Sequence, residues 1–138
     1  CMNQNAEVVI SLATLQSQFQ KKIDHNLSVH GISFSEFLVL HHLFGAVNMT
    51  MRRIDLAESV GLSASGVTRL VNPMEKNHLV QKEVHARDAR VSLVQLSKTG
   101  EEMYRNALVS FEHCADELLG ALKNTQIATL LGLIGNIL

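Results

Sequence analysis

Residues 52–77 read RRIDLAESVGLSASGVTRLVNPMEKN, and this stretch decides the fold of the 138-residue chain. Its first part, residues 52–60, predicts a short helix because apolar residues recur with helical spacing. Gly61 and Leu62 then interrupt the pattern. Ser63 has a side chain that can cap a new helix, which we expect to continue to about residue 77. Two short helices joined by so tight a turn indicate a helix-turn-helix.

The second of these helices begins with small hydroxyl residues and a glycine, which allow close approach to a phosphate or a base edge. The candidate DNA-binding residues are Ser63, Ser65, Gly66, Thr68 and Arg69. A helix N-terminus attracts phosphate, and an arginine one turn farther along can reach a guanine edge in the major groove. An ordinary capped helix uses the same small residues, so this motif by itself leaves DNA binding open.

A β-hairpin is predicted directly after the helix-turn-helix. Residues 79–84 and 91–96 are rich in β-branched side chains, and the six residues HARDAR lie between them. This tip carries Arg87 and Arg90 around Asp88, which can pair with an arginine and fix its direction. An arginine on a hairpin beside a recognition helix can enter the minor groove. The alternative is a solvated turn whose exposed ion pair contributes little.

Helices are expected on both sides of this central part. An apolar stripe runs through residues 8–27, a capping box at Ser33 and Glu36 opens a second helix, and a heptad-like stripe occupies residues 104–122. A last helix is expected from about residue 124. The terminal stripes exceed what a small middle domain can cover, so we expect them to pair with a second copy in a two-fold dimer. The alternative is that the two ends pack only on each other.

The composition fits one folded domain, and residues 1–138 are taken as that domain. The formal net charge is −1, with 12 Lys and Arg against 13 Asp and Glu. Residues 50–100 hold eight basic and five acidic residues, a balance of +3, while the remainder holds four and eight, a balance of −4. A basic central segment between acidic terminal segments favours a polyanion partner that binds to one part of the fold.

Other classes of protein find little support in the sequence. No apolar run approaches the ~20 residues of a membrane span and no signal peptide is evident, so we expect a cytoplasmic protein without membrane contact. We find no phosphate loop, nucleophile motif or spaced metal ligands, which predicts no enzyme activity, no cofactor and no metal. Adjacent His41 and His42 should diverge by roughly 100° on a helix. Cys114, beside the heptad stripe, is interpreted as an ordinary buried cysteine.

Residues 33–100 resemble the winged helix-turn-helix of the MarR family, the multiple antibiotic resistance regulators. The matching segments are Asp55-Leu56-Ala57, Gly61-Leu62-Ser63, Val67-Thr68-Arg69-Leu70-Val71, Met74-Glu75-Lys76, Leu79-Val80, Arg87-Asp88-Ala89-Arg90 and Leu96-Ser97-Lys98-Thr99-Gly100. Helices within residues 5–30 and 98–138 fit the family's dimerisation helices. Pro73 inside the second helix departs from the family pattern, and so does His78, where a glycine is common. Asn77 or His78 must then take the left-handed cap.

The resemblance implies a mainly α-helical winged helix-turn-helix with a small β-hairpin, and a homodimer that binds a palindromic operator in double-stranded DNA. Such regulators are usually repressors and are often released by a small ligand. The resemblance also implies that Arg90 enters the minor groove while Asp88 orients it. We expect a ligand cleft framed by the first, second and fifth helices, with a half-buried His41 near it. The alternative function is a winged-helix interaction module that does not bind DNA.

Overall fold

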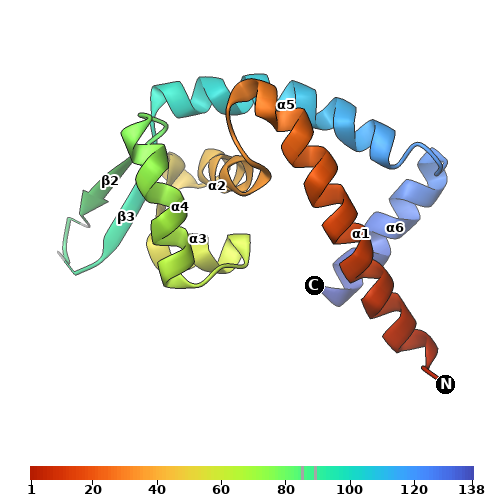
Figure 1. The fold of residues 1–138 in the computed structure, drawn as a ribbon. Helices are drawn as coiled ribbons and strands as arrows, with labels where there is room; N and C mark the ends of the chain where they lie inside the picture. Colours follow the sequence, from red (N-terminus) through yellow and green to blue (C-terminus); the bar gives the residue numbers. More distant parts are fainter. Residues whose placement is uncertain (85, 89) are drawn as a thin grey trace.

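The structure, a computed structural model, describes residues 1–84, 86–88 and 90–138. Its helices and strands follow in the order α1 (Gln4–Leu27), the 3-10 helix η1 (Ser28–His30), α2 (Phe34–Phe44), the 3-10 helix η2 (Val47–Met49), β1 (Thr50–Arg52), α3 (Arg53–Val60), α4 (Ala64–Lys76), β2 (Val80–Val84), β3 (Ser92–Leu96), α5 (Lys98–Leu118) and α6 (Asn124–Ile137). In Figure 1, α5 spans the top, α3, α4 and the strands lie below one end, and α1 and α6 extend from the other. The predicted winged helix-turn-helix fold is confirmed.

The helix-turn-helix is formed by α3 and α4. Gly61 takes the left-handed backbone conformation that ends α3, with φ at 72°, and the Ser63 hydroxyl then caps α4 by accepting the Gly66 amide. One apolar face of the two helices is buried: Leu56, Ala57, Val67, Val71 and Met74. Ile54 of α3 lies outside this face and is exposed. Burial of this face orients both helices, which leaves the start of α4 at the surface.

Helix α4 passes through Pro73 and ends one turn later, at Lys76. Proline removes one backbone hydrogen bond, and near the end of a helix this loss is small. His78 has φ at 64° and so takes the left-handed conformation that the sequence analysis assigned to either Asn77 or His78. The amide of Leu79 then bonds back to the carbonyl of Met74 at 2.9 Å, which directs the chain into β2.

The hairpin belongs to a three-stranded antiparallel sheet of order β1-β3-β2, and its first strand was not predicted. In the register, Thr50 lies opposite Gln95 and Val80 opposite Leu96. A strand of three residues is too short to show alternation, and the sequence analysis placed Arg52 at the start of the following helix. That helix begins at Arg53 instead, because Arg52 pairs with β3.

The base of the hairpin is joined to the start of α5 through Ser97. The Ser97 amide donates to the carbonyl of Leu79 at 3.0 Å, and the hydroxyl shares its proton between the carbonyls of His78 and Leu79, at 2.5 and 2.9 Å. The hydroxyl oxygen accepts the amide of Gly100 at 3.0 Å. A Cβ atom on Gly100 would overlap the Leu79 carbonyl. The wing is therefore fixed against α5 at a point where only glycine fits.

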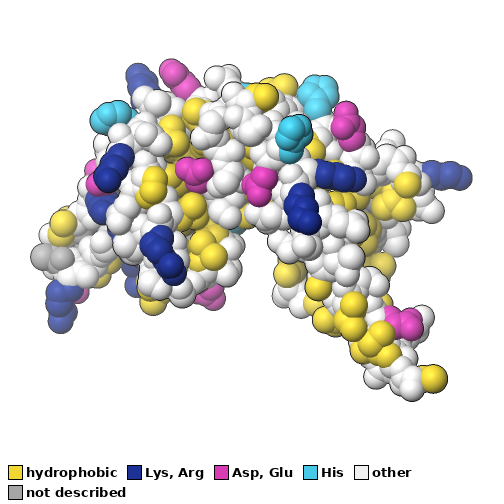
Figure 2. Space-filling view, in the orientation of Figure 1, with side chains coloured by type: hydrophobic (Ala, Val, Ile, Leu, Met, Phe, Trp, Pro, Cys, Tyr) yellow, Lys and Arg dark blue, Asp and Glu magenta, His cyan; other side chains and the backbone are white. Residues whose placement is uncertain are grey.

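The two ends of the chain leave much apolar surface exposed. α5 ends at Leu118, so Leu122, predicted on the same helical stripe, lies in the turn before α6. The poor helix former Gly120 falls in that turn. None of the described residues of α6 is buried, and Figure 2 shows apolar side chains along the free half of α1. The exposed apolar residues include Val8, Val9, Ile10, Leu12, Leu131, Leu133 and Ile137. Packing of the two ends on each other, the alternative arrangement, does not cover these stripes.

Candidate nucleic-acid interface

The first turns of α4 present several of the residues predicted to contact DNA. Ser63 and Ser65 are exposed, and their hydroxyl oxygens lie 3.2 Å apart. The Ser63 oxygen also accepts the amide of Gly66 at 3.1 Å, so it serves the helix cap. Arg69 is exposed one turn after Ser65, on the same face of the helix. The structure thus brings Ser63, Ser65 and Arg69 to one exposed surface.

Thr68 is half-buried, and an arginine that the sequence analysis did not single out contacts it. Arg53, the first residue of α3, donates from Nη1 to Thr68 Oγ1 at 2.9 Å. The Thr68 hydroxyl donates in turn to the carbonyl of Ala64 at 3.1 Å. The hydroxyl therefore has its proton and one lone pair in use, which leaves one acceptor position and the methyl group for a base. The contact joins two helices, so no local spacing predicts it.

The wing presents Arg90 at its tip. The side chain is 91% exposed, yet Asp88 holds it by hydrogen bonds from Nε at 3.1 Å and from Nη2 at 3.3 Å. The Arg90 amide also donates to Asp88, at 3.0 Å. Arg87 is exposed on the same tip. His85 and Ala89, which complete the predicted tip, lie outside the described residues.

A second arginine–aspartate pair lies at the start of α3. Arg52 donates from Nε and Nη2 to the two carboxylate oxygens of Asp55, at 2.9 and 3.1 Å. The hydrogen bond from Arg52 lowers the pKa of the Asp55 carboxyl, and the positive charge of the guanidinium acts in the same direction. Asp55 therefore remains an anion and compensates the charge of Arg52.

A cavity of about 320 Å³ lies between the wing and the helix-turn-helix. Its lining residues are Arg52, Arg53, Ile54, Ala64, Arg90, Val91 and Ser92. The fold thus gathers three arginines from β1, α3 and the wing beside the first residue of α4. In the sequence, Arg52 and Arg53 are visible only as part of the basic charge of the middle of the chain. Their meeting with Arg90 depends on the packing of β1 against β3.

His41, the predicted ligand contact, is exposed rather than half-buried. Its Nδ1 lies 2.7 Å from the hydroxyl of Tyr104, which draws the ring along the surface of α5. The rings of His41 and His42 meet edge to face, with centroids 5.2 Å apart, so the two side chains do not diverge as predicted. Burial and the charge of His41 both lower the pKa of His42.

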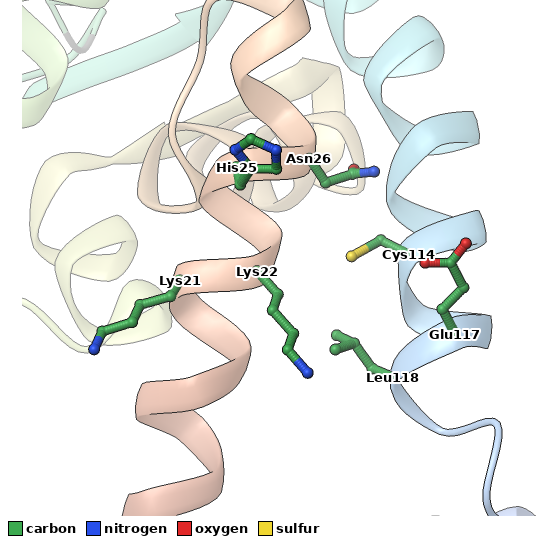
Figure 3. A pocket seen from close by; sticks show the side chains of 7 residues that line it. All are labelled: Lys21, Lys22, His25, Asn26, Cys114, Glu117 and Leu118. Carbon is green, nitrogen blue, oxygen red and sulfur yellow. The ribbon is translucent and has the colours of Figure 1, made fainter.

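A pocket of about 630 Å³ lies between α1 and α5 (Figure 3), with no contribution from α2 or His41 among the described residues. It is lined by Lys21, Lys22, His25, Asn26, Cys114, Glu117 and Leu118. In Figure 3, Cys114 and Leu118 point from α5 toward α1, whereas Lys21 points away. The predicted cleft of three helices stays a prediction beside this pocket of two. Cys114 is buried, as predicted, and burial raises the pKa of its thiol.

Other kinds of site find no basis in the part of the chain that the structure describes. No three side chains from His, Cys, Asp or Glu gather there as a metal site. Over the same residues, no helix has both the length and the apolar character that crossing a membrane demands. The features that remain are the exposed start of α4, the wing and the cavity between them.

Known proteins similar to this chain are regulators of transcription. Residues 15–107 match the family model described as transcriptional regulator SarA/Rot. The transcriptional repressor MprA of Escherichia coli K12 is 26% identical over 112 residues, 81% of this chain and 64% of MprA. The uncharacterised HTH-type transcriptional regulator YwaE of Bacillus subtilis is 24% identical over 108 residues, 78% of this chain and 62% of YwaE. The chain thus spans less than two thirds of the length of these curated relatives.

Solved structures of MarR-type regulators share the fold. A putative MarR-like regulator from Bacillus cereus has a TM-score of 0.80 at 25% identity, covering 96% of this chain and 94% of that one. A MarR family regulator from Streptomyces coelicolor, solved in complex with DNA, has a TM-score of 0.87 at 18% identity, covering 99% and 88%. A mutant MarR from Escherichia coli with operator DNA has a TM-score of 0.84 at 18% identity, covering 99% of each chain.

Proposed function

Because the chain belongs to the SarA/Rot family of transcriptional regulators and has the MarR-type winged helix, we propose that it binds double-stranded DNA as a homodimer and represses transcription from a palindromic operator. The start of α4 enters the major groove and the wing lies against the minor groove and the backbone. The contact residues are Ser63, Ser65, Gly66, Thr68, Arg69, Arg87 and Arg90, with Asp88 orienting Arg90.

The observation that carries this proposal is the exposed Arg90 held by Asp88 beside the first turn of α4. An exposed arginine ordinarily loses side-chain freedom when it binds, and a fixed one loses less. Arg90 and Ala64 line the same cavity, so the wing and the recognition helix are close enough to contact one stretch of duplex.

The homodimer is supported by the exposed apolar stripes of α1 and α6. A stripe of this kind favours burial, and a second copy supplies a matching stripe through two-fold symmetry. A two-fold dimer places two recognition helices on one face of the duplex, so it reads an inverted repeat. The DNA complexes of the structural relatives from Streptomyces coelicolor and Escherichia coli support this use of the fold.

Repression and release by a small ligand complete the proposal. The description of MprA as a repressor supports repression. Two places are proposed for the ligand: the pocket between α1 and α5, and the surface at His41 and Tyr104. Both adjoin helices that set the distance between the two DNA-binding lobes. A ligand that binds better when the distance between the lobes does not match the operator would weaken operator binding. The coupling free energy between the two sites would be about 1–3 kcal/mol.

Selection of bound sequences from a random duplex pool tests DNA binding and symmetry together. The wild type should enrich an inverted repeat whose half-sites lie about one helical turn, ~10 bp, apart. Arg69→Ala should enrich the same repeat with relaxed base preference at one position per half-site, while Arg105→Ala, which removes a charge from α5, should keep the wild-type pattern. Failure of the folded wild-type protein to enrich any sequence would contradict the proposal and favour an interaction module.

A further inference from the structure

The cavity between the wing and the helix-turn-helix is lined by arginines from both of these parts of the fold. Arg52, Arg53 and Arg90 line it from three separate segments of the chain. Arginine side chains that line one concavity raise the positive potential there, and the planar fork of a guanidinium matches the oxygens of a phosphate. The site therefore has the chemistry of an anion site rather than that of a base-reading surface.

The three arginines differ in how their charge is compensated. Arg52 and Arg90 are each held by an aspartate. Arg53 donates to the neutral hydroxyl of Thr68, and within the described residues it has no ion pair. Arg53 is half-buried at the start of α3, so its position is fixed by the packing of that helix. It thus contributes a positive charge that pairs with no carboxylate in the part of the chain that the structure describes.

We propose that this cavity binds one phosphate of the DNA backbone in each half-site, with Arg53 as its main ligand and Arg90 as the second. The inference rests on the proposed DNA-binding function. A backbone phosphate carries one negative charge, and its two unesterified oxygens can each accept from a guanidinium. Ala64 and Ser92 contribute small side chains to the wall, which leaves room for the sugar–phosphate chain to approach.

Arg53 also connects this phosphate site to the reading face of α4. A guanidinium has five N–H donors, and the bond to Thr68 at 2.9 Å uses one of them, so donors remain for the phosphate. A phosphate held by Arg53 fixes the register in which Thr68 meets the base edges. Contacts to phosphate position a protein on DNA in this way, whereas contacts to bases specify the sequence.

Neutralising the backbone phosphates one at a time tests the inference. The probe is the selected operator duplex with a single methylphosphonate, titrated with the full chain. The wild type should lose about tenfold in affinity at one phosphate in each half-site, the effect of one charge-assisted hydrogen bond. Arg53→Gln should bind the unmodified duplex about tenfold more weakly and be insensitive to that methylphosphonate. The slope of its log affinity against log salt concentration should be less steep by about one unit per half-site.

Matched variants distinguish a phosphate contact at this site from a general loss of positive charge. Arg105→Gln removes the same charge from α5 and should keep the wild-type sensitivity at every phosphate. Arg53→Lys should restore sensitivity, and Arg90→Gln should lose part of it, which keeps the test decisive if Arg53→Gln fails to fold. Wild-type sensitivity in the Arg53 and Arg90 variants overturns the inference but leaves DNA binding intact. Failure of the wild type to bind any duplex overturns the proposed function instead.

Discussion

Arg90 extends from the wing into solvent, and Asp88 holds it through three hydrogen bonds. Arg90→Ala should weaken binding to operator and random DNA alike and flatten the salt dependence, because contacts to phosphate and the minor groove are mainly electrostatic. Asp88→Ala should reproduce part of this loss, since it only frees the arginine. Anisotropy titrations over a range of salt concentrations measure both effects. Wild-type binding by Arg90→Ala, with Asp88→Ala lowering only the melting temperature, would mean that the wing is merely a structural hairpin.

Arg69 lies on the exposed face of α4, the part of the proposed interface that enters the major groove. Arg69→Ala should cost about 1–3 kcal/mol of binding free energy on the operator and relax specificity at one position per half-site, because it removes a contact to a base edge. Competition with every single-base variant of the operator measures this. Binding to random DNA should change little by comparison. A uniform loss over all sequences would show that Arg69 contacts the backbone and not a base.

His42 provides a prediction about pH. Its pKa is lowered in the folded chain, so the unfolded chain binds more protons as the pH falls below the ordinary histidine value of about 6.5. The contribution of His42 to stability is therefore complete above that value and is lost as the pH falls through the lowered folded pKa. His42→Gln should reduce the drop in melting temperature between neutral and mildly acid pH. An unchanged drop would show that other groups cause it.

At the scale of elements, the joint between the wing and α5 depends on Gly100. Gly100→Ala should destabilise the fold by about 1–3 kcal/mol, because a methyl group there meets the Leu79 carbonyl and overpacks the joint. Gly45→Ala is the matched control, since its Cβ would meet only the carbonyl of His41 at 3.8 Å, an ordinary contact. Chemical denaturation measures both changes. Equal stability of the two variants would show that the backbone at Leu79 shifts at little cost to accommodate the methyl group.

The sequence predicted those elements whose signals are local. The cap at Ser63, the capping box at Ser33 and Glu36, and the turn at Gly61 are chemical requirements of neighbouring residues, and the structure confirms them. β1 was missed because it exists only through pairing with β3. A three-residue segment has too few positions to show a period of two.

The candidate DNA-binding site also combines contacts that the sequence predicts locally with contacts that it does not. Asp88 and Arg90 lie two residues apart, so their pairing is visible in the sequence, whereas the Arg53–Thr68 bond joins two helices and has no local sign. The bond between His41 and Tyr104 likewise joins residues far apart in the chain. Contacts of this kind depend on packing, which the sequence pattern does not encode residue by residue.

At the scale of the whole molecule, the exposed stripes predict the state of association. Light scattering at micromolar concentration should give about twice the chain mass of 15.2 kDa. Leu131→Glu should weaken the dimer without disturbing the core of one chain, because Leu131 is 71% exposed on α6. Val47→Glu, at a residue that is 85% exposed near the wing, is the control and should leave the mass unchanged. A monomeric wild type with a cooperative melt would contradict the dimer.

The unburied α6 has a consequence for how long the protein survives in a cell. In the proposed dimer, a helix with no fully buried residue among those described is held mainly by the second copy, so its order would depend on how many copies are present. At low copy number the terminal arm frays and becomes a substrate for proteases, while at high copy number it is protected. Turnover then slows as the protein accumulates. Supply and degradation together set a threshold of synthesis below which the regulator is cleared and above which it persists.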